Sequence, residues 1–136
     1  MYNYYIRMNN NYTTKTQYLF RINKGAHDIS DDTKINEYVD KNKRPMPFEN
    51  MIFIGDGATD IPCFRLMKEE GGMSIAVYEP KKRGSKKLVT SFLDDGRVNA
   101  IAPANYCPGS KLDNLIKANI DCLVSRYALI DIVDSN

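Results

Sequence analysis

Two aspartates follow the most apolar short segment of the sequence, within the stretch MIFIGDGATDIPCF at residues 51–64. Asp56 comes directly after the segment, between Gly55 and Gly57, and Asp60 lies four residues further on. Glycine allows a sharp turn and close approach to a ligand, and Mg²⁺ prefers carboxylate oxygens. The spacing therefore suits a metal site. The simpler alternative is that Asp60 is only a helix N-cap and Asp56 only a turn residue.

The elements that would position these aspartates alternate along the chain. Short apolar runs predict strands, and helical spacing with capping residues predicts helices. The expected strands are 51–55, 73–78 and 98–103, and the expected helices are 13–25, 60–72, 86–96 and a long one that Ser110 opens. This order predicts an α/β fold with parallel strands and right-handed crossovers. In such folds ligands bind beyond the carboxyl ends of the strands, where Asp56 would lie.

Local signals predict where the helices begin and which faces they bury. Thr13 or Thr14 is expected to cap the first helix and Gly25 to end it. Asp60 is expected at the N-cap of the second helix, and Ser110 forms a capping-box relation with Asp113. Helical spacing predicts three buried faces: Tyr18, Leu19 and Ile22; Leu88, Val89, Phe92 and Leu93; and Leu112, Leu115, Ile116, Ile120, Leu123, Val124 and Tyr127.

Polar segments are expected on the surface. Residues 1–12 are predicted to be an irregular lead-in, and residues 26–50 a surface loop with one short helix near 33–39. His27 lies in that loop, where a catalytic role is not expected. The run EPKKRGSKK, residues 79–87, could contact phosphates, but a solvated loop is the favoured interpretation.

The bulk composition excludes several classes of protein. The chain has 136 residues, a net charge of +2 and 43% hydrophobic residues, which suits one domain with a core. The charge is too balanced to predict nucleic-acid or membrane binding, and no apolar run is long enough to span a bilayer. Three cysteines without paired spacing, Cys63, Cys107 and Cys122, argue against a disulfide framework or zinc site and favour the cytoplasm.

The segment FENMIFIGDGATDIPCF resembles the fourth motif of the haloacid dehalogenase (HAD) superfamily, an apolar strand that ends in GDGxxD. The later segments GGMSIAVYEP and DGRVNAIAPANY and the long last helix resemble one phosphatase-like branch. Upstream, YTTKTQYLFRINKG resembles the segment of the third motif, which carries a lysine. Lys15 is the better match for that lysine, and Lys24 is the alternative.

The resemblance implies Mg²⁺-dependent phosphate-ester hydrolysis through an aspartyl-phosphate. Asp56 would bind Mg²⁺, and Asp60 would support the ion directly or through water. Lys15 would steady the nucleophile and the phosphoryl oxygens, and Gly57 would lie against the phosphate. The substrate would be a phosphorylated small molecule.

The superfamily's nucleophile motif, DxDx(T/V), has no match in the sequence. The chain thus resembles only the C-terminal portion of a HAD hydrolase, with residues 13–136 as an incomplete Rossmann-like core without the N-terminal strands and cap. Weak Mg²⁺ binding and little or no activity are expected of it alone. Two alternatives remain: a non-catalytic phosphate-binding or metal-binding module, and half of an enzyme completed by a second chain. In either case the strand at 51–55 is expected to be a sheet edge that pairs with another chain.

Overall fold

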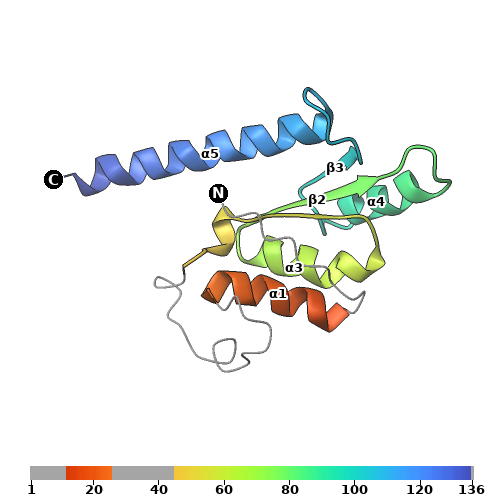
Figure 1. Ribbon diagram of the computed structural model, residues 1–136, viewed down its shortest axis with the longest axis horizontal. Coiled ribbons are helices and arrows are strands. Elements are labelled where there is room, and N and C mark those ends of the chain that lie inside the picture. Colours follow the sequence, from red (N-terminus) through yellow and green to blue (C-terminus); the bar gives the residue numbers. More distant parts are fainter. Residues whose placement is uncertain (1–11, 26–44, 136) are drawn as a thin grey trace.

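A computed structural model describes residues 12–25 and 45–135. Helices and strands alternate along the described chain, as Figure 1 shows. The elements in order are α1 (Tyr12–Lys24), the 3₁₀ turn η2 (Phe48–Asn50), β1 (Ile52–Gly55), the 3₁₀ turn η3 (Ala58–Asp60), α3 (Ile61–Glu69), β2 (Met73–Tyr78), α4 (Ser85–Asp94), β3 (Ala100–Pro103) and α5 (Lys111–Asp134). The predicted order of strands and helices is confirmed.

The three strands form one parallel sheet in the order β1-β2-β3. Ile52 of β1 pairs with Met73 of β2, and Ile75 of β2 pairs with Ala100 of β3. Within the described residues β1 therefore lies at an edge of the sheet, as the sequence predicts. Parallel strands bring all three carboxyl ends to the same edge, where Asp56 follows β1.

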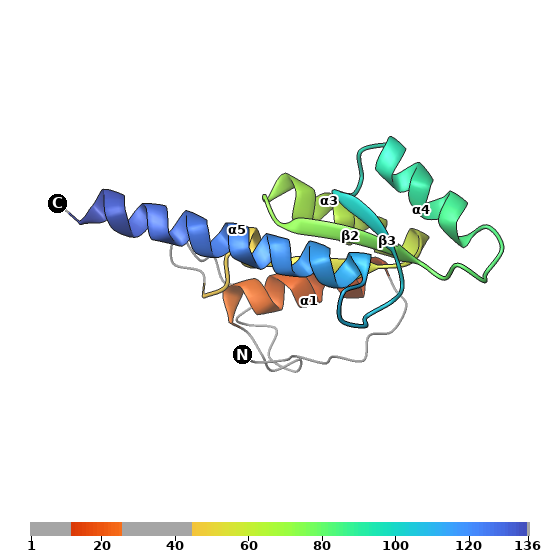
Figure 2. The same ribbon diagram turned by 90° about the horizontal axis from the view of Figure 1, so that it is seen from above.

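Apolar side chains cover both faces of the sheet because successive strand residues point to opposite sides. On one face, Ala76 packs with Phe64 of α3 and with Val89 and Phe92 of α4. On the other face, Ile75, Val77 and Ala102 pack with Leu112 of α5. Figures 1 and 2 show the resulting three layers, with α5 on one side of the sheet and α1 and α3 on the other.

Helix α1 packs mainly against α3, in a cluster that Phe53 of β1 also contacts. Leu19 of α1 packs with Cys63 and Met67 of α3 and with Phe48 of η2. Gly25 ends α1 with a φ of +71°, as predicted. The prediction that Thr13 or Thr14 caps α1 is wrong, because the helix begins at Tyr12 and contains both residues.

The apolar faces of α4 and α5 are only partly buried. Val89 and Phe92 are buried, but Leu88 and Leu93 are 41% and 38% exposed, since these two leucines lie at the margins of the α4 face that packs on β2 and β3. In α5, Ser110 caps the helix as predicted, with its Oγ accepting a 3.1 Å hydrogen bond from the backbone N–H of Asp113.

The predicted core face of α5 is confirmed only in its first turns. Leu112 is fully buried, whereas Val124 is 63% exposed. Ile120 and Tyr127 are also exposed, because α5 extends beyond the end of the sheet (Figures 1 and 2). A helix of 24 residues is about 36 Å long, which is more than short strands can cover.

The short helix predicted near 33–39 and His27 lie outside the described residues, as do residues 1–11 of the irregular lead-in predicted at 1–12. The last residue of that predicted lead-in, Tyr12, instead begins α1. None of the helices in the described ranges combines the length and the apolar character that crossing a bilayer requires.

Candidate functional site

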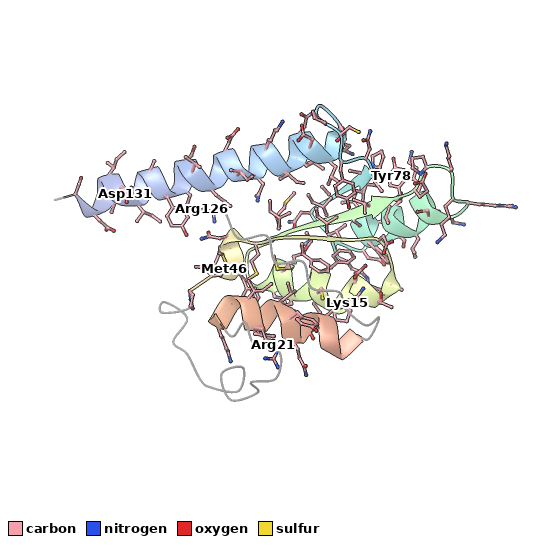
Figure 3. The ribbon with its side chains drawn as sticks, viewed as in Figure 1. Lys15, Arg21, Met46, Tyr78, Arg126 and Asp131 are labelled. Carbon is pink, nitrogen blue, oxygen red and sulfur yellow. The ribbon has the colours of Figure 1, made fainter. Side chains whose placement is uncertain are left out.

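An open cleft of about 480 Å³ lies at the carboxyl ends of the three strands. All three strand ends and α1 contribute to its walls. The lining residues that carry polar groups are Lys15, Asp56, Asp60, Tyr78, Glu79, Lys82, Ser85 and Tyr106. Figure 3 shows Lys15 and Tyr78, from α1 and β2, at the same end of the molecule. The cleft thus forms where the topology predicts a ligand site.

Asp60 is the buried centre of the site, with 3% of its surface exposed. The turn η3 folds the chain back so that Asp60 Oδ2 accepts hydrogen bonds from the backbone N–H groups of Asp56 (2.9 Å) and Gly57 (3.1 Å). The side chain does not cap α3, although Asp60 directly precedes that helix. Asp60 thus has the predicted N-cap position, but the predicted hydrogen bond to α3 is wrong. Its carboxylate binds the N–H groups of the preceding loop instead.

Lys15 pairs with the other oxygen of this carboxylate. Its Nζ lies 2.6 Å from Asp60 Oδ1 and donates a 3.1 Å hydrogen bond to Thr59 Oγ1. The side chains of Lys15 and Asp60 are 12% and 4% exposed, so little water screens the pair. Removing one partner of so buried a pair leaves an uncompensated charge, which costs about 3–5 kcal/mol.

The structure also distinguishes the two candidate lysines. Lys15 lies in the first turns of α1 and lines the cleft, whereas Lys24 lies in the last turn and is not among the lining residues. Because a 13-residue helix is about 20 Å long, the two ends of α1 cannot serve the same site. Lys15 is therefore the lysine that the fold brings to Asp60.

The two glycines around Asp56 have different roles. A Cβ atom on Gly55 would lie 2.6 Å from both Cγ and Oδ2 of Asp60, so glycine is required there for Asp60 to pack against the strand end. Gly57 has an extended backbone with a φ of −150°, and a Cβ there would meet nothing within 4 Å. Gly55 therefore serves close packing, whereas Gly57 has the open space that a ligand needs.

Asp56 is exposed at the wall of the cleft, and no cation pairs with its carboxylate among the described residues. Its oxygens are hard donors, which fit Mg²⁺. Asp60 fits direct coordination poorly, because Lys15 occupies one of its oxygens and two backbone N–H groups occupy the other. Within residues 12–25 and 45–135, no three His, Cys, Asp or Glu side chains gather as a metal-binding group. A metal at Asp56 would thus complete its coordination with water and ligand oxygens.

Cys63 lies behind the aspartate loop and is fully buried. The pKa of the thiol is raised to about 11, mainly by burial and also by the nearby Asp60 carboxylate, while Lys15 partly opposes the rise. The thiol therefore stays protonated at neutral pH and is unsuited to nucleophilic attack. Cys107 and Cys122 are exposed, and all three cysteines are free.

Five polar residues of the cleft, Tyr78, Glu79, Lys82, Ser85 and Tyr106, are not among the site residues predicted from the sequence. Tyr78 ends β2, Glu79 comes from the β2–α4 connection, Ser85 begins α4, and Tyr106 comes from the β3–α5 connection. Lys82 is predicted to lie in a solvated loop, but it also lines the cleft. Their position in the sequence is the signal that could have identified these residues. They lie at the end of a predicted parallel strand or shortly after it, where ligand-binding residues gather.

No protein-family model matches the chain, and no solved structure matches it. An uncharacterized protein of Borreliella burgdorferi is 38% identical to the chain over 115 residues. The alignment covers 82% of this chain but 37% of the relative, so the chain spans little more than a third of that protein's length.

Proposed function

We propose that the chain is the phosphate-binding and Mg²⁺-binding portion of a HAD-like phosphohydrolase. One observation carries the proposal. Lys15 of α1 and Asp60 of the GDGATD loop, 45 positions apart, meet at 2.6 Å beside Asp56, at the carboxyl end of β1. A lysine and an exposed aspartate in one cleft suit phosphoryl transfer, in which catalysis is mostly positioning and charge neutralisation.

Each residue has a distinct role in this proposal. Asp56 holds Mg²⁺, which when bound supplies positive charge to the phosphate oxygens. Lys15 lines the same cleft and adds a second positive charge. Asp60 orients Lys15 and fixes the backbone of Asp56 and Gly57. The open space at Gly57 leaves room for the phosphate of a small phosphorylated molecule.

The isolated chain is proposed to bind phosphate without hydrolysing its esters efficiently. In the described residues, the carboxylates that line the cleft are Asp56, Asp60 and Glu79. Asp60 is engaged with Lys15, and Asp56 is assigned to Mg²⁺. Glu79 follows β2 and does not match the nucleophile motif DxDx(T/V). The free cysteines favour a reducing, cytoplasmic setting.

The test combines an activity assay with thermal unfolding. In the wild type, we expect Mg²⁺ plus inorganic phosphate to raise the Tm and turnover of p-nitrophenyl phosphate to stay at background. Asp56→Asn removes the negative charge that attracts Mg²⁺ and should abolish the Tm shift. The matched control is Asp121→Asn on α5, because Asp121 is exposed and does not line the cleft.

Two results would contradict the proposal in different ways. Turnover that Asp56→Asn abolishes would show that the chain is an active enzyme. No Tm shift in the wild type would show that the cleft does not bind Mg²⁺ and phosphate.

The second candidate function is pairing with another chain that supplies the nucleophile. It rests on the position of β1, which is at the edge of the described sheet yet directly precedes Asp56. A strand added to this edge would end beside the cleft and could bring a carboxylate to it. The added strand could come from a second copy of this chain or from a partner protein.

A further inference from the structure

We propose, on the basis of the function proposed above, that the substrate carries a second anionic group and that Lys82 binds it. The first group would be the phosphate at Asp56 and Lys15, near the end of β1. Lys82 belongs to the connection between β2 and α4 and lines the same cleft. The site would therefore select bisphosphates, or phosphates with a carboxylate, over simple monophosphates.

The position of Lys82 distinguishes it from the other basic residues of its loop. The run at 79–87 contains Lys81, Lys82, Arg83, Lys86 and Lys87, and of these Lys82 lines the cleft in the described structure. The Lys86 ammonium instead lies 5.7 Å from the centre of the Tyr78 ring. Exposed basic residues are common, but a lysine that reaches a polar cleft is placed to meet a ligand.

Of the two lysines that line the cleft, Lys82 is the one whose charge no carboxylate of the described residues balances. The charge of Lys15 is balanced by Asp60 at 2.6 Å. Within the described parts of the chain, no carboxylate forms an ion pair with Lys82. Glu79 also lines the cleft, but one of its carboxylate oxygens accepts a 3.2 Å hydrogen bond from the backbone N–H of Lys81. An anionic group on the ligand would give Lys82 a counter-charge.

Hydrogen bonds between its own residues hold the loop that carries Lys82 in place. The Lys82 backbone N–H donates to the Glu79 carbonyl (3.0 Å), and the Ser85 N–H donates to the Lys82 carbonyl (3.1 Å). The Glu79 N–H donates to Ser85 Oγ at 3.0 Å, which closes the loop. Gly84, with a φ of +82°, allows the turn into α4. A fixed loop lowers the entropy cost of ordering Lys82 around a ligand.

The cleft has the size and lining for a ligand larger than phosphate. Its volume of about 480 Å³ falls within the usual range for small-molecule sites. Tyr106, which is 66% exposed, offers an aromatic surface to the body of the ligand. The first turn of α4 contains no acidic residue that would repel an anion near Lys82. A sugar-sized molecule with two anionic groups fits these features.

The experiment compares two ligands that differ by one phosphate, fructose 6-phosphate and fructose 1,6-bisphosphate. Calorimetric titration of the full chain at a fixed free Mg²⁺ concentration gives the Kd of each. We expect the bisphosphate to bind roughly tenfold more tightly than the monophosphate. A gain of this size is what one additional hydrogen bond between charged groups gives. Lys82→Gln should remove this preference and leave the affinity for fructose 6-phosphate unchanged. Lys81→Gln, in the same loop but outside the cleft, should retain the preference.

The possible outcomes separate this inference from the function on which it rests. Equal Kd values in the wild type would overturn the second anion site and leave the phosphate site intact. If Lys82→Gln still prefers the bisphosphate, the role of Lys82 is overturned. The role is also overturned if Lys82→Gln loses affinity equally for both ligands. If neither ligand binds the wild type, both the second site and the proposed function are refuted.

Discussion

At the scale of residues, the site depends on one buried carboxylate. Asp60 joins α1 through Lys15 and holds the loop after β1 through the N–H groups of Asp56 and Gly57. A buried carboxylate is tolerated only when it is paired and hydrogen-bonded, and Asp60 meets both conditions. The residue that faces the cleft, Asp56, is therefore positioned by a second aspartate that is itself engaged elsewhere.

The contrast between Gly55 and Gly57 can be tested directly. Gly55→Ala places a methyl group 2.6 Å from the Asp60 carboxylate, so we expect it to lower the free energy of unfolding by about 1–3 kcal/mol. Gly57→Ala meets open space in an extended backbone and should change it by less than about 0.5 kcal/mol. Urea unfolding measures both. Equal effects of the two substitutions would contradict the assignment of Gly55 to close packing.

The buried thiol of Cys63 predicts a pH dependence of stability. Its pKa rises from 9.0 to about 11 on folding, so the folded state retains the proton more strongly than the unfolded state. This contribution is fully present below pH 9 and is lost as the pH rises through 11. We expect the wild type to lose roughly 2 kcal/mol more than Cys63→Ala across this interval. Urea unfolding of both proteins at several pH values gives the difference, and parallel pH profiles would contradict the prediction.

At the scale of elements, the sequence correctly predicted the features that depend only on residues close together in the chain. The strand at β1, the end of α1 at Gly25 and the cap of α5 at Ser110 are all confirmed. Burial along α4 and α5 was predicted less well, because helical periodicity shows which face is apolar but not how far a neighbouring sheet extends. Leu93, at the margin of the α4 face, and Val124, on the part of α5 that extends beyond the sheet, share apolar faces with buried residues yet are exposed.

The exposed end of α5 leads to a prediction about truncation. Removing residues 128–136 deletes Leu129, Ile130, Ile132 and Val133, which are 45–70% exposed. We expect the free energy of unfolding to change by less than about 0.5 kcal/mol, since little buried apolar surface is lost. The control Leu112→Ala, in the buried first turn of the same helix, should cost about 2–5 kcal/mol. A large loss on truncation would indicate that the end of α5 is covered by something in solution.

At the scale of the whole molecule, the site is assembled from segments that are distant in sequence. The GDGATD loop predicted Asp56 and Asp60 because a strand, glycines and acids follow one another. Lys15 was predicted only through a resemblance, with Lys24 as an alternative, because its role depends on how α1 packs against α3. The place of Lys82 depends on the β2–α4 connection, and no pattern within residues 79–87 distinguishes it from its basic neighbours.

The edge position of β1 can be tested in the intact chain. If another copy or a partner pairs with β1, its backbone N–H groups gain hydrogen-bond acceptors and exchange more slowly. We expect hydrogen exchange at Ile52–Gly55 to slow as the protein concentration rises. The amides of β2, which has a neighbour on each side, should be unaffected and act as the internal control. Concentration-independent exchange in β1 would argue against self-association through this edge.

The packing of α1 has a consequence for the dynamics of the site. Helix α1 packs mainly on α3, through one cluster around Leu19, Cys63 and Met67, while the aspartates belong to the strand end. Contacts within a folded protein open locally at lower free energy than the whole chain unfolds. A local opening that releases α1 would withdraw Lys15 and leave Asp60 without its counter-ion. If the cleft binds phosphate as proposed, docking of α1 and assembly of the site would be a single equilibrium, and a bound phosphate would shift it toward the docked state.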